Sequence, residues 1–203
     1  KEFKGIKKDI YYPMINKIKK SSKNSKNFLK IFNDQRIKTV TKHLKLSKKK
    51  ISVVRHETCH QIYGYYTQQN KTKNPIILTL EGGGDDSSAT ISFKKKLGIF
   101  EKYKTNEAMM GRLYRYITLL LGMKPGQHEY KVMGLAPYGS KYHGIRALEF
   151  FRKFNSIKNY KIKNSRVFKD CYYASKKSLE GERFDGIAWG LQTYLEEFLT
   201  KWV

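Results

Sequence analysis

Two histidines of this 203-residue chain, His56 and His60, stand four positions apart in the segment HETCH. On an α-helix that spacing puts both imidazoles on one face, one turn apart, where they can bind a single cation. Histidine pairs at this spacing also occur as solvated or packed side chains, so the pair alone leaves both interpretations open. Glu81 ends a neighbouring predicted strand and would add a carboxylate to the pair. Mixed nitrogen and oxygen ligands suit iron, manganese or zinc better than calcium.

An acidic glycine turn begins at Glu81 and continues through Gly82, Gly83, Gly84 and Asp85. Glycines let the backbone approach a ligand closely, and successive N–H groups in such a turn can bind an anion. The same residues serve equally well as a plain hairpin turn, so both interpretations stay open. The turn is not a P-loop, because GxxxxGKS/T is absent. It is not the GxGxxG turn of dinucleotide-binding folds either, because a strand follows it.

A third candidate, Lys131, lies in the segment EYKVMGLAPYG and could meet a phosphate as a point charge. Gly134 and Gly139 would admit the ligand, and Tyr138 could pack on a base or a sugar. The alternative is a structural loop that buries Met133. Local physical chemistry does not separate the two.

The elements that position these residues are predicted from hydrophobic patterns. Residues 51–54 (ISVV) are β-branched and bounded by charged residues, which predicts a buried strand ending at Arg55. A helix should begin at His56, at the end of that strand where open α/β sheets bind ligands. Residues 75–80 and 87–93 predict the two strands of a hairpin closed by the glycine turn.

Helical periodicity recurs in the remaining chain, which predicts helices near residues 27–46, 107–121 and 184–203. The lysine-rich stretch at 155–178 shows no clear period. Strands and helices in this order indicate an α/β fold with a mixed sheet flanked by helices.

The length and the charge limit the class of protein. A chain of 203 residues can bury the core of one domain or two small ones. The net charge of +25 favours a polyanionic partner such as nucleic acid. However, lysine, asparagine, isoleucine and tyrosine are abundant together, as in AT-rich genomes, and arginine, which base readout favours, is sparse. We therefore expect no nucleic-acid partner.

The cysteines and the absence of long apolar stretches predict the compartment. Cys59 and Cys171 do not form a disulfide framework, and the lysine-rich start does not read as a signal peptide. No apolar stretch approaches the roughly 20 residues of a membrane helix. We expect a cytoplasmic protein without a membrane partner.

Taken together, three motifs resemble the carbamoyltransferase family of the NodU and antibiotic O-carbamoyltransferase type. RHETCH resembles the family's HHxxHA, LTLEGGGDD resembles its strand followed by DGxGD, and MMGRLYRYITLLLGMKPGQHEYKVMGLAPYGS resembles its helix, glycine turn and EYKVMGLAPYG. The similarity extends weakly through GIAWGLQTYLEEF, so it spans about residues 38–203 and leaves 1–37 as a poorly matched, lysine-rich segment. The family's N-terminal domain is TsaD-like, which implies the actin-like ATPase (ribonuclease H-like) fold, incomplete in this chain.

The resemblance implies an enzyme that moves a carbamoyl group from carbamoyl phosphate, through a carbamoyl-adenylate, to the hydroxyl of a small-molecule acceptor. It implies ATP with Mg²⁺ and a divalent metal, commonly iron, with Mn²⁺ or Zn²⁺ as alternatives. A homodimer is a further expectation. The family's site positions fall on metal ligands His56, His60 and Glu81, on catalytic residues Arg55 and Lys131, and on nucleotide-binding residues Gly82, Gly83, Gly84, Asp85, Lys131, Gly134 and Tyr138.

Several departures from the family pattern bear on activity. Arg55 replaces the first histidine of the HH pair, and Glu81 replaces an aspartate. The family's opening aspartate strand, its later glycine-rich segment with a further aspartate ligand, and its C-terminal adenylate-forming domain have no counterpart here. We therefore expect this chain to be a fragment that does not catalyse the reaction by itself. The alternatives are a catalytically inactive nucleotide-binding module and a tRNA-associated TsaD-like protein.

Overall fold

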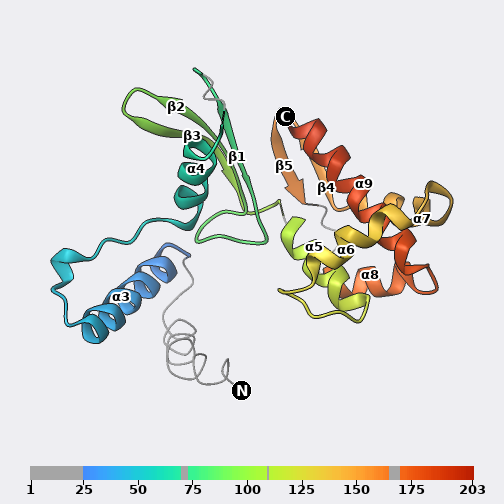
Figure 1. Cartoon of the computed structure of the whole chain (residues 1–203), viewed down its shortest axis with the longest axis horizontal. Helices are drawn as coiled ribbons and strands as arrows, with labels where there is room; N and C mark the ends of the chain where they lie inside the picture. The colour runs from blue at the N-terminus through green and yellow to red at the C-terminus, as the bar shows by residue number, and fades with distance from the viewer. Residues whose placement is uncertain (1–24, 70–72, 109, 165–169) are drawn as a thin grey trace. The chain divides into compact units, whose positions relative to one another are not determined.

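Figure 1 shows the computed structural model of the protein, which describes residues 25–69, 73–108, 110–164 and 170–203. The chain divides into two compact units, residues 1–59 and 60–203, and the boundary falls inside one helix. Most of the predicted N-terminal segment 1–37 lies outside the described residues.

The first unit contains the predicted N-terminal helix, α3 (Ser25–Leu44). Lys42 and His43 lie in its last turn, where positive charge stabilises the negative end of the helix dipole. A short 3-10 helix, η2 (Lys48–Lys50), follows, and the hydroxyl of Ser47 caps it by accepting a hydrogen bond from the Lys49 amide. Between residues 25 and 55, the first unit thus contains two helices followed by an extended connection.

That connection corrects the sequence prediction at residues 51–54, which do not form a strand. Val53 and Val54 are 37% and 54% exposed, whereas the prediction required a buried strand. A β-branched run favours an extended backbone, but it becomes a strand only where a neighbour supplies a hydrogen-bonded ladder. Among the described residues no strand pairs with this run. The helix predicted from His56 is confirmed as α4 (His56–Tyr66).

The second unit contains a three-stranded sheet of β1 (Ile76–Leu80), β2 (Ala89–Lys95) and β3 (Gly98–Thr105). The strands pair in the order β1-β2-β3, and both pairs are antiparallel, because each connection is a short turn. The predicted hairpin is therefore confirmed, and the sequence missed β3. The sheet is antiparallel and not mixed in the part of the chain that the structure describes, so the α/β prediction holds only at the level of class.

The two faces of this sheet differ in chemistry. Leu78 pairs with Ile91 on the face that joins the hydrophobic core. Thr79 pairs with Thr90 on the other face, where their hydroxyls lie 2.7 Å apart and are buried. The amide of Gln61, on α4, donates a hydrogen bond to the Thr90 hydroxyl over 3.0 Å. Helix α4 thus covers this face, and its Gln61 side chain pairs with the Thr90 hydroxyl.

The rest of the second unit is mainly helical. The helices predicted near 107–121 and 184–203 are confirmed, whereas the stretch at residues 155–178 showed no clear period in the sequence. The elements are α5 (Met110–Leu120), α6 (Glu129–Leu135), η3 (Ala136–Tyr138), α7 (Lys141–Phe151), β4 (Asn155–Lys158), β5 (Lys161–Asn164), α8 (Cys171–Leu179) and α9 (Phe184–Trp202). Strands β4 and β5 form a separate antiparallel hairpin.

The core of this unit lies where α7 and α9 pack together. Phe151 is fully buried and stacks on Tyr194 with ring centroids 6.3 Å apart. The helices approach closely because Gly190 presents no side chain: a β-carbon there would lie 2.8 Å from the Leu148 amide nitrogen and 2.9 Å from Ala147 Cβ. Burying each large side chain contributes about 1.5–3 kcal/mol, so the close approach matters for stability.

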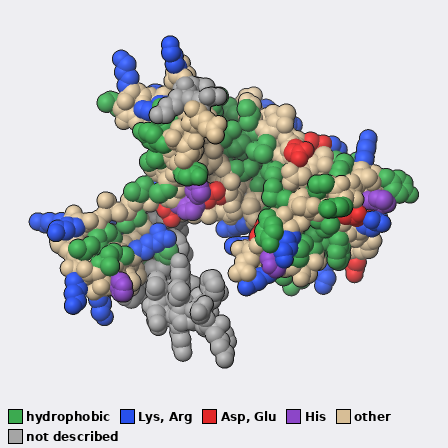
Figure 2. All heavy atoms as spheres, in the orientation of Figure 1, with side chains coloured by type: hydrophobic (Ala, Val, Ile, Leu, Met, Phe, Trp, Pro, Cys, Tyr) green, Lys and Arg blue, Asp and Glu red, His purple; other side chains and the backbone are tan. Residues whose placement is uncertain are grey.

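The surface chemistry agrees with the dispersed charge of the sequence. On the face shown in Figure 2, Lys and Arg side chains stand in several separate groups and not in one continuous patch. Among the helices that the structure describes, none is both long and apolar enough to cross a bilayer.

We predict that Gly190→Ala lowers the free energy of unfolding by about 1–3 kcal/mol, because its methyl group overlaps the backbone and side chain of α7. Chemical denaturation measures this. Gly64→Ala is the matched control, since Gly64 lies in α4 with nothing within 4 Å of an added β-carbon. That change should leave stability unchanged or raise it by up to about 1 kcal/mol. Equal effects of the two variants would contradict the packing described.

The two cysteines should differ in reactivity. Cys59 is exposed, whereas burial raises the pKa of the Cys171 thiol to about 11. Only the thiolate reacts rapidly, so iodoacetamide at pH 8 should label Cys59 alone in the native protein and both thiols after denaturation. Mass spectrometry of the peptides reads out the result. Fast native labelling of Cys171 would show that its helix is not packed as described.

Candidate functional site

The position of Glu81 follows from the alternation of strand β1. Ile77, Thr79 and Glu81 share one face, because successive side chains of a strand point to opposite sides. The backbone confirms that this register continues past the strand end, since the Glu81 amide donates to the Ser88 carbonyl over 2.8 Å. Glu81 therefore points to the side of the sheet that α4 covers.

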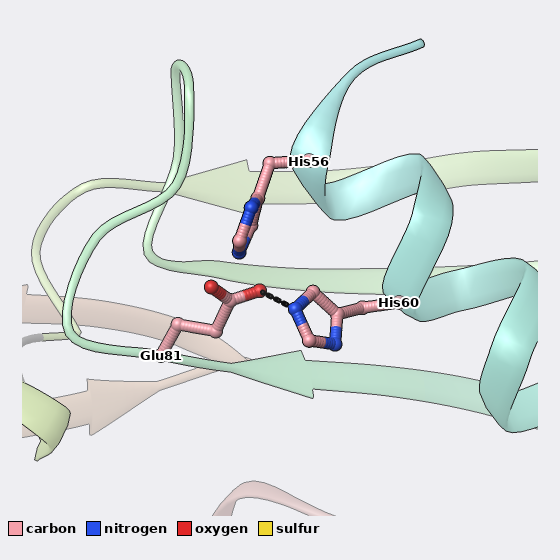
Figure 3. Close-up of side chains that lie close together, drawn as sticks. All are labelled: His56, His60 and Glu81. Atoms are coloured by element: carbon pink, nitrogen blue, oxygen red, sulfur yellow. Dashed lines mark ion pairs between the residues drawn. The ribbon is translucent and has the colours of Figure 1, made fainter. Parts of the chain in front are cut away.

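Helix α4 brings His60 to the same place. Gln61 anchors the helix through its hydrogen bond to Thr90, and the preceding residue, His60, reaches the strand end. Figure 3 shows the result: His60 Nε2 lies 3.4 Å from Glu81 Oε1. The side chain of Glu81 is 18% exposed and that of His60 is 51% exposed, so the pair stands at the rim of the unit and is open to a ligand.

His56 joins this pair because it stands one turn earlier on the same continuous helix, as Figure 3 shows. One ligand atom from each of His56, His60 and Glu81 lies within 4.8 Å of the other two. Donors about 2.1 Å from a tetrahedral ion lie about 3.4 Å apart, which matches the separation of His60 and Glu81. The longest separation exceeds that value, so a bound ion requires a small closing movement. Two imidazoles and one carboxylate fit a divalent transition metal.

Arg55 precedes the histidines and faces an acidic partner. Its Nε lies 3.7 Å from Glu57 Oε2, and the Glu57 side chain is only 2% exposed. Arg55 itself is 40% exposed. The Nε side of the guanidinium thus offsets the negative charge of the buried Glu57 carboxylate. The rest of the Arg55 side chain is partly exposed to solvent.

The glycine turn is a closed turn of the hairpin. Gly84 donates its amide to the Ser87 carbonyl over 2.9 Å, and Gly83 has a φ of 149°, which residues with a β-carbon rarely adopt. Asp86 ties the turn to β3, since its carboxylate lies 2.7 Å from Lys104 Nζ. Asp85 is half-buried beside them. The turn therefore has the hairpin role predicted as one alternative, and its conformation requires glycine.

The same three glycines also line a hollow of about 440 Å³. The other lining residues come from α5, from the segment before α6 and from the first residue of α6: Gly111, Arg112, Arg115, Gly126 and Glu129. The turn and α5 touch directly, because a β-carbon on Gly111 would overlap the Gly82 amide nitrogen and lie 2.7 Å from Gly82 Cα. Sequence reasoning did not single out the two arginines. Their spacing of three on a helix that begins beside the turn is the signal that could have found them.

The residues of the EYKVMGLAPYG segment lie elsewhere. The segment folds as α6 and η3 and not as a loop, and Met133 is 46% exposed. Lys131 is exposed with Nζ 3.5 Å from His128 Nε2, and Tyr138 is 79% exposed. Gly134 has nothing within 4 Å of an added β-carbon. Lys131, Gly134 and Tyr138 do not line the glycine hollow, although a second hollow of about 370 Å³ begins at Met133 and runs to α9.

Comparison with known proteins gives a family match and two relatives. The family described as "Carbamoyltransferase N-terminus" matches residues 6–201. An uncharacterized protein of Methanocaldococcus jannaschii is 29% identical over 151 residues, which cover 72% of this chain and 29% of that protein. A second uncharacterized protein of the same archaeon is 28% identical over 134 residues, covering 56% of this chain and 21% of its own length. The chain thus spans less than a third of either relative.

We predict that the double variant His56→Ala, His60→Ala loses a bound divalent metal. Two of three ligands disappear, and one carboxylate does not hold a transition metal alone. Elemental analysis of protein loaded with Fe²⁺, Mn²⁺ or Zn²⁺ and then desalted should give about one ion per chain for the parent and nearly none for the variant. His43→Ala, His143→Ala is the matched control, and it should keep the metal. Equal metal content in both variants would refute this ligand set.

Proposed function

This chain belongs to the carbamoyltransferase N-terminus family, and from that premise we propose that it is the part of a carbamoyltransferase that holds a nucleotide while a carbamoyl group is transferred. The observation that supports this most is the adjacency of two features along one backbone. The carboxylate of Glu81 faces His60, and the next three residues are the glycines that line a hollow. A site for a cation and a site for an anion thus begin one residue apart.

In this proposal each group of residues has the role that its chemistry suits. His56, His60 and Glu81 would hold a divalent metal, commonly iron in this family, which when bound supplies Lewis acidity and a template for phosphate oxygens. The turn from Gly82 to Gly84 would admit the phosphates of ATP, bound with Mg²⁺, close to the backbone. We assign Asp85 to the polar rim of that turn.

The segment along α6 and η3 would take the other end of the nucleotide. Tyr138 exposes most of its ring, so it can pack on a base or a sugar, with Gly134 leaving room nearby. The exposed Lys131 amine supplies a point charge for a phosphate. Arg55, whose guanidinium is partly open, is assigned to a phosphate or to the carbamoyl donor.

The proposed reaction has three balanced steps. Water releases phosphate from carbamoyl phosphate, and the resulting carbamate attacks the α-phosphate of ATP to form carbamoyl-adenylate and pyrophosphate. The oxygen of a small-molecule hydroxyl then attacks the carbamoyl carbon. The bond from that carbon to the adenylate oxygen breaks, AMP leaves, and the hydroxyl proton passes to a base or to water. A protein that carries out these steps consumes one ATP per carbamoyl group transferred.

We predict that the full-length protein containing this chain releases pyrophosphate from ATP only when carbamoyl phosphate is present. Glu81→Gln should lower the rate of the later transfer step, measured as AMP release, by about 100-fold or more, the scale seen when one preorganised electrostatic group is lost. Glu180→Gln is the control, because Glu180 is an exposed acid at the end of α8. It should leave the rate within about twofold.

Two other outcomes would change the assignment. ATP binding without carbamoyl-phosphate-dependent pyrophosphate release would indicate the inactive nucleotide-binding module. Tight binding of tRNA with a steep salt dependence would indicate the tRNA-associated alternative. Neither result is compatible with the carbamoyl transfer proposed here.

A further inference from the structure

Two arginines of helix α5 stand at the wall of the glycine hollow. Arg112 and Arg115 are three residues apart, so they project from the same side of the helix. Neither is among the metal or nucleotide positions named above. Both are exposed at the hollow and bring two permanent positive charges to it.

Arg112 is held in place by the turn itself. Its Nε donates a hydrogen bond to the Gly82 carbonyl over 2.8 Å. Its Nη2 would lie 3.3 Å from a β-carbon on Gly83, so the guanidinium rests against the turn where a larger residue would crowd it. One edge of the guanidinium is therefore used to orient the group, and the other donors face the hollow.

Arg115 lines the same hollow one turn further along α5. Its Nη2 would lie 3.4 Å from a β-carbon on Gly126. Within the described part of the chain, no residue forms a hydrogen bond or an ion pair with the Arg115 side chain. The one acid of the lining, Glu129, accepts a hydrogen bond from the Gly126 amide over 2.5 Å instead. Among the described residues, no acid thus forms an ion pair with this guanidinium at the hollow.

We propose that Arg112 and Arg115 form an anion subsite that binds the terminal phosphates of a nucleoside triphosphate. Guanidinium groups bind phosphate oxygens with paired hydrogen bonds, and the start of α5 adds a favourable dipole. Glycines from three segments make room for the oxygens, and about 440 Å³ lies within the range of small-molecule sites. The identification of the ligand as a nucleotide rests on the proposed function. The anion subsite rests on the hollow alone.

The test measures binding to the full-length protein by calorimetry, without added divalent ions and at fixed ionic strength. The probes are inorganic tripolyphosphate, ATP and AMP. Arg115→Gln should lower the affinity for tripolyphosphate and for ATP about tenfold. It should change the affinity for AMP less than twofold, because AMP lacks the terminal phosphates. Arg115→Lys keeps the positive charge but loses the paired N–H donors of the guanidinium, so it should weaken tripolyphosphate and ATP binding less than Arg115→Gln does. Arg112→Gln should also lower the affinity for tripolyphosphate and ATP.

Lys158→Gln is the matched control, since it removes one positive charge on the exposed β4–β5 hairpin. It should change every affinity less than twofold. The proposal is overturned if the parent protein binds no tripolyphosphate, if Arg115→Gln binds it unchanged, or if Lys158→Gln weakens it as much. Loss of AMP binding in parallel with ATP would also overturn it, because the arginines would then act on the whole nucleotide.

This outcome is independent of the transfer reaction. If tripolyphosphate binding depends on Arg115 but the protein transfers no carbamoyl group, the subsite stands and the proposed function fails. If the protein transfers carbamoyl groups and Arg115→Gln changes neither tripolyphosphate nor ATP binding, the function stands and the subsite fails.

Discussion

The hydrogen bond between Gln61 and Thr90 is the contact on which the candidate site depends. It closes a buried polar layer between α4 and the sheet, in which the Thr79 and Thr90 hydroxyls also meet. Buried polar groups are costly unless they are paired, so this hydrogen bond favours the position of the helix along the sheet at which Gln61 and Thr90 meet. His60 precedes Gln61 on the helix, and Glu81 follows Thr79 on the same face of the strand. Their meeting is a consequence of that register.

The glycine turn serves two structural purposes at once. It closes an antiparallel hairpin, for which Gly83 supplies a backbone conformation that other residues rarely adopt. It also lacks side chains on the side where α5 arrives, and this leaves the hollow with its arginine wall. A turn that only reversed the chain would not need three glycines. The close approach of α5 accounts for Gly82, whose added β-carbon would lie 3.2 Å from the Gly111 carbonyl carbon.

The elements that the sequence predicted correctly are those whose signal is local. Amphipathic periodicity identified α9, and turn residues between two apolar runs identified the β1–β2 hairpin. The failures were non-local. Residues 51–54 have the composition of a strand but no partner strand among the described residues. In β3, GIFEKYKT, two apolar residues and then two charged residues stand side by side, so the strand shows no period of two. Arg112 could not be assigned to the glycine turn because it lies 30 positions from Gly82 in the chain.

The contact between Gly111 and Gly82 couples the position of α5 to that of the glycine turn. Where side chains lie between two elements, a change of rotamer can accommodate a small displacement of either element. Here the two backbones touch with no side chain between them. Any tilt or slide of α5 is therefore transmitted directly to the peptide that follows Glu81, and the arginine wall moves together with the turn. On this side the hollow is bounded by main-chain atoms, so a ligand there meets backbone whose position does not depend on side-chain rotamers.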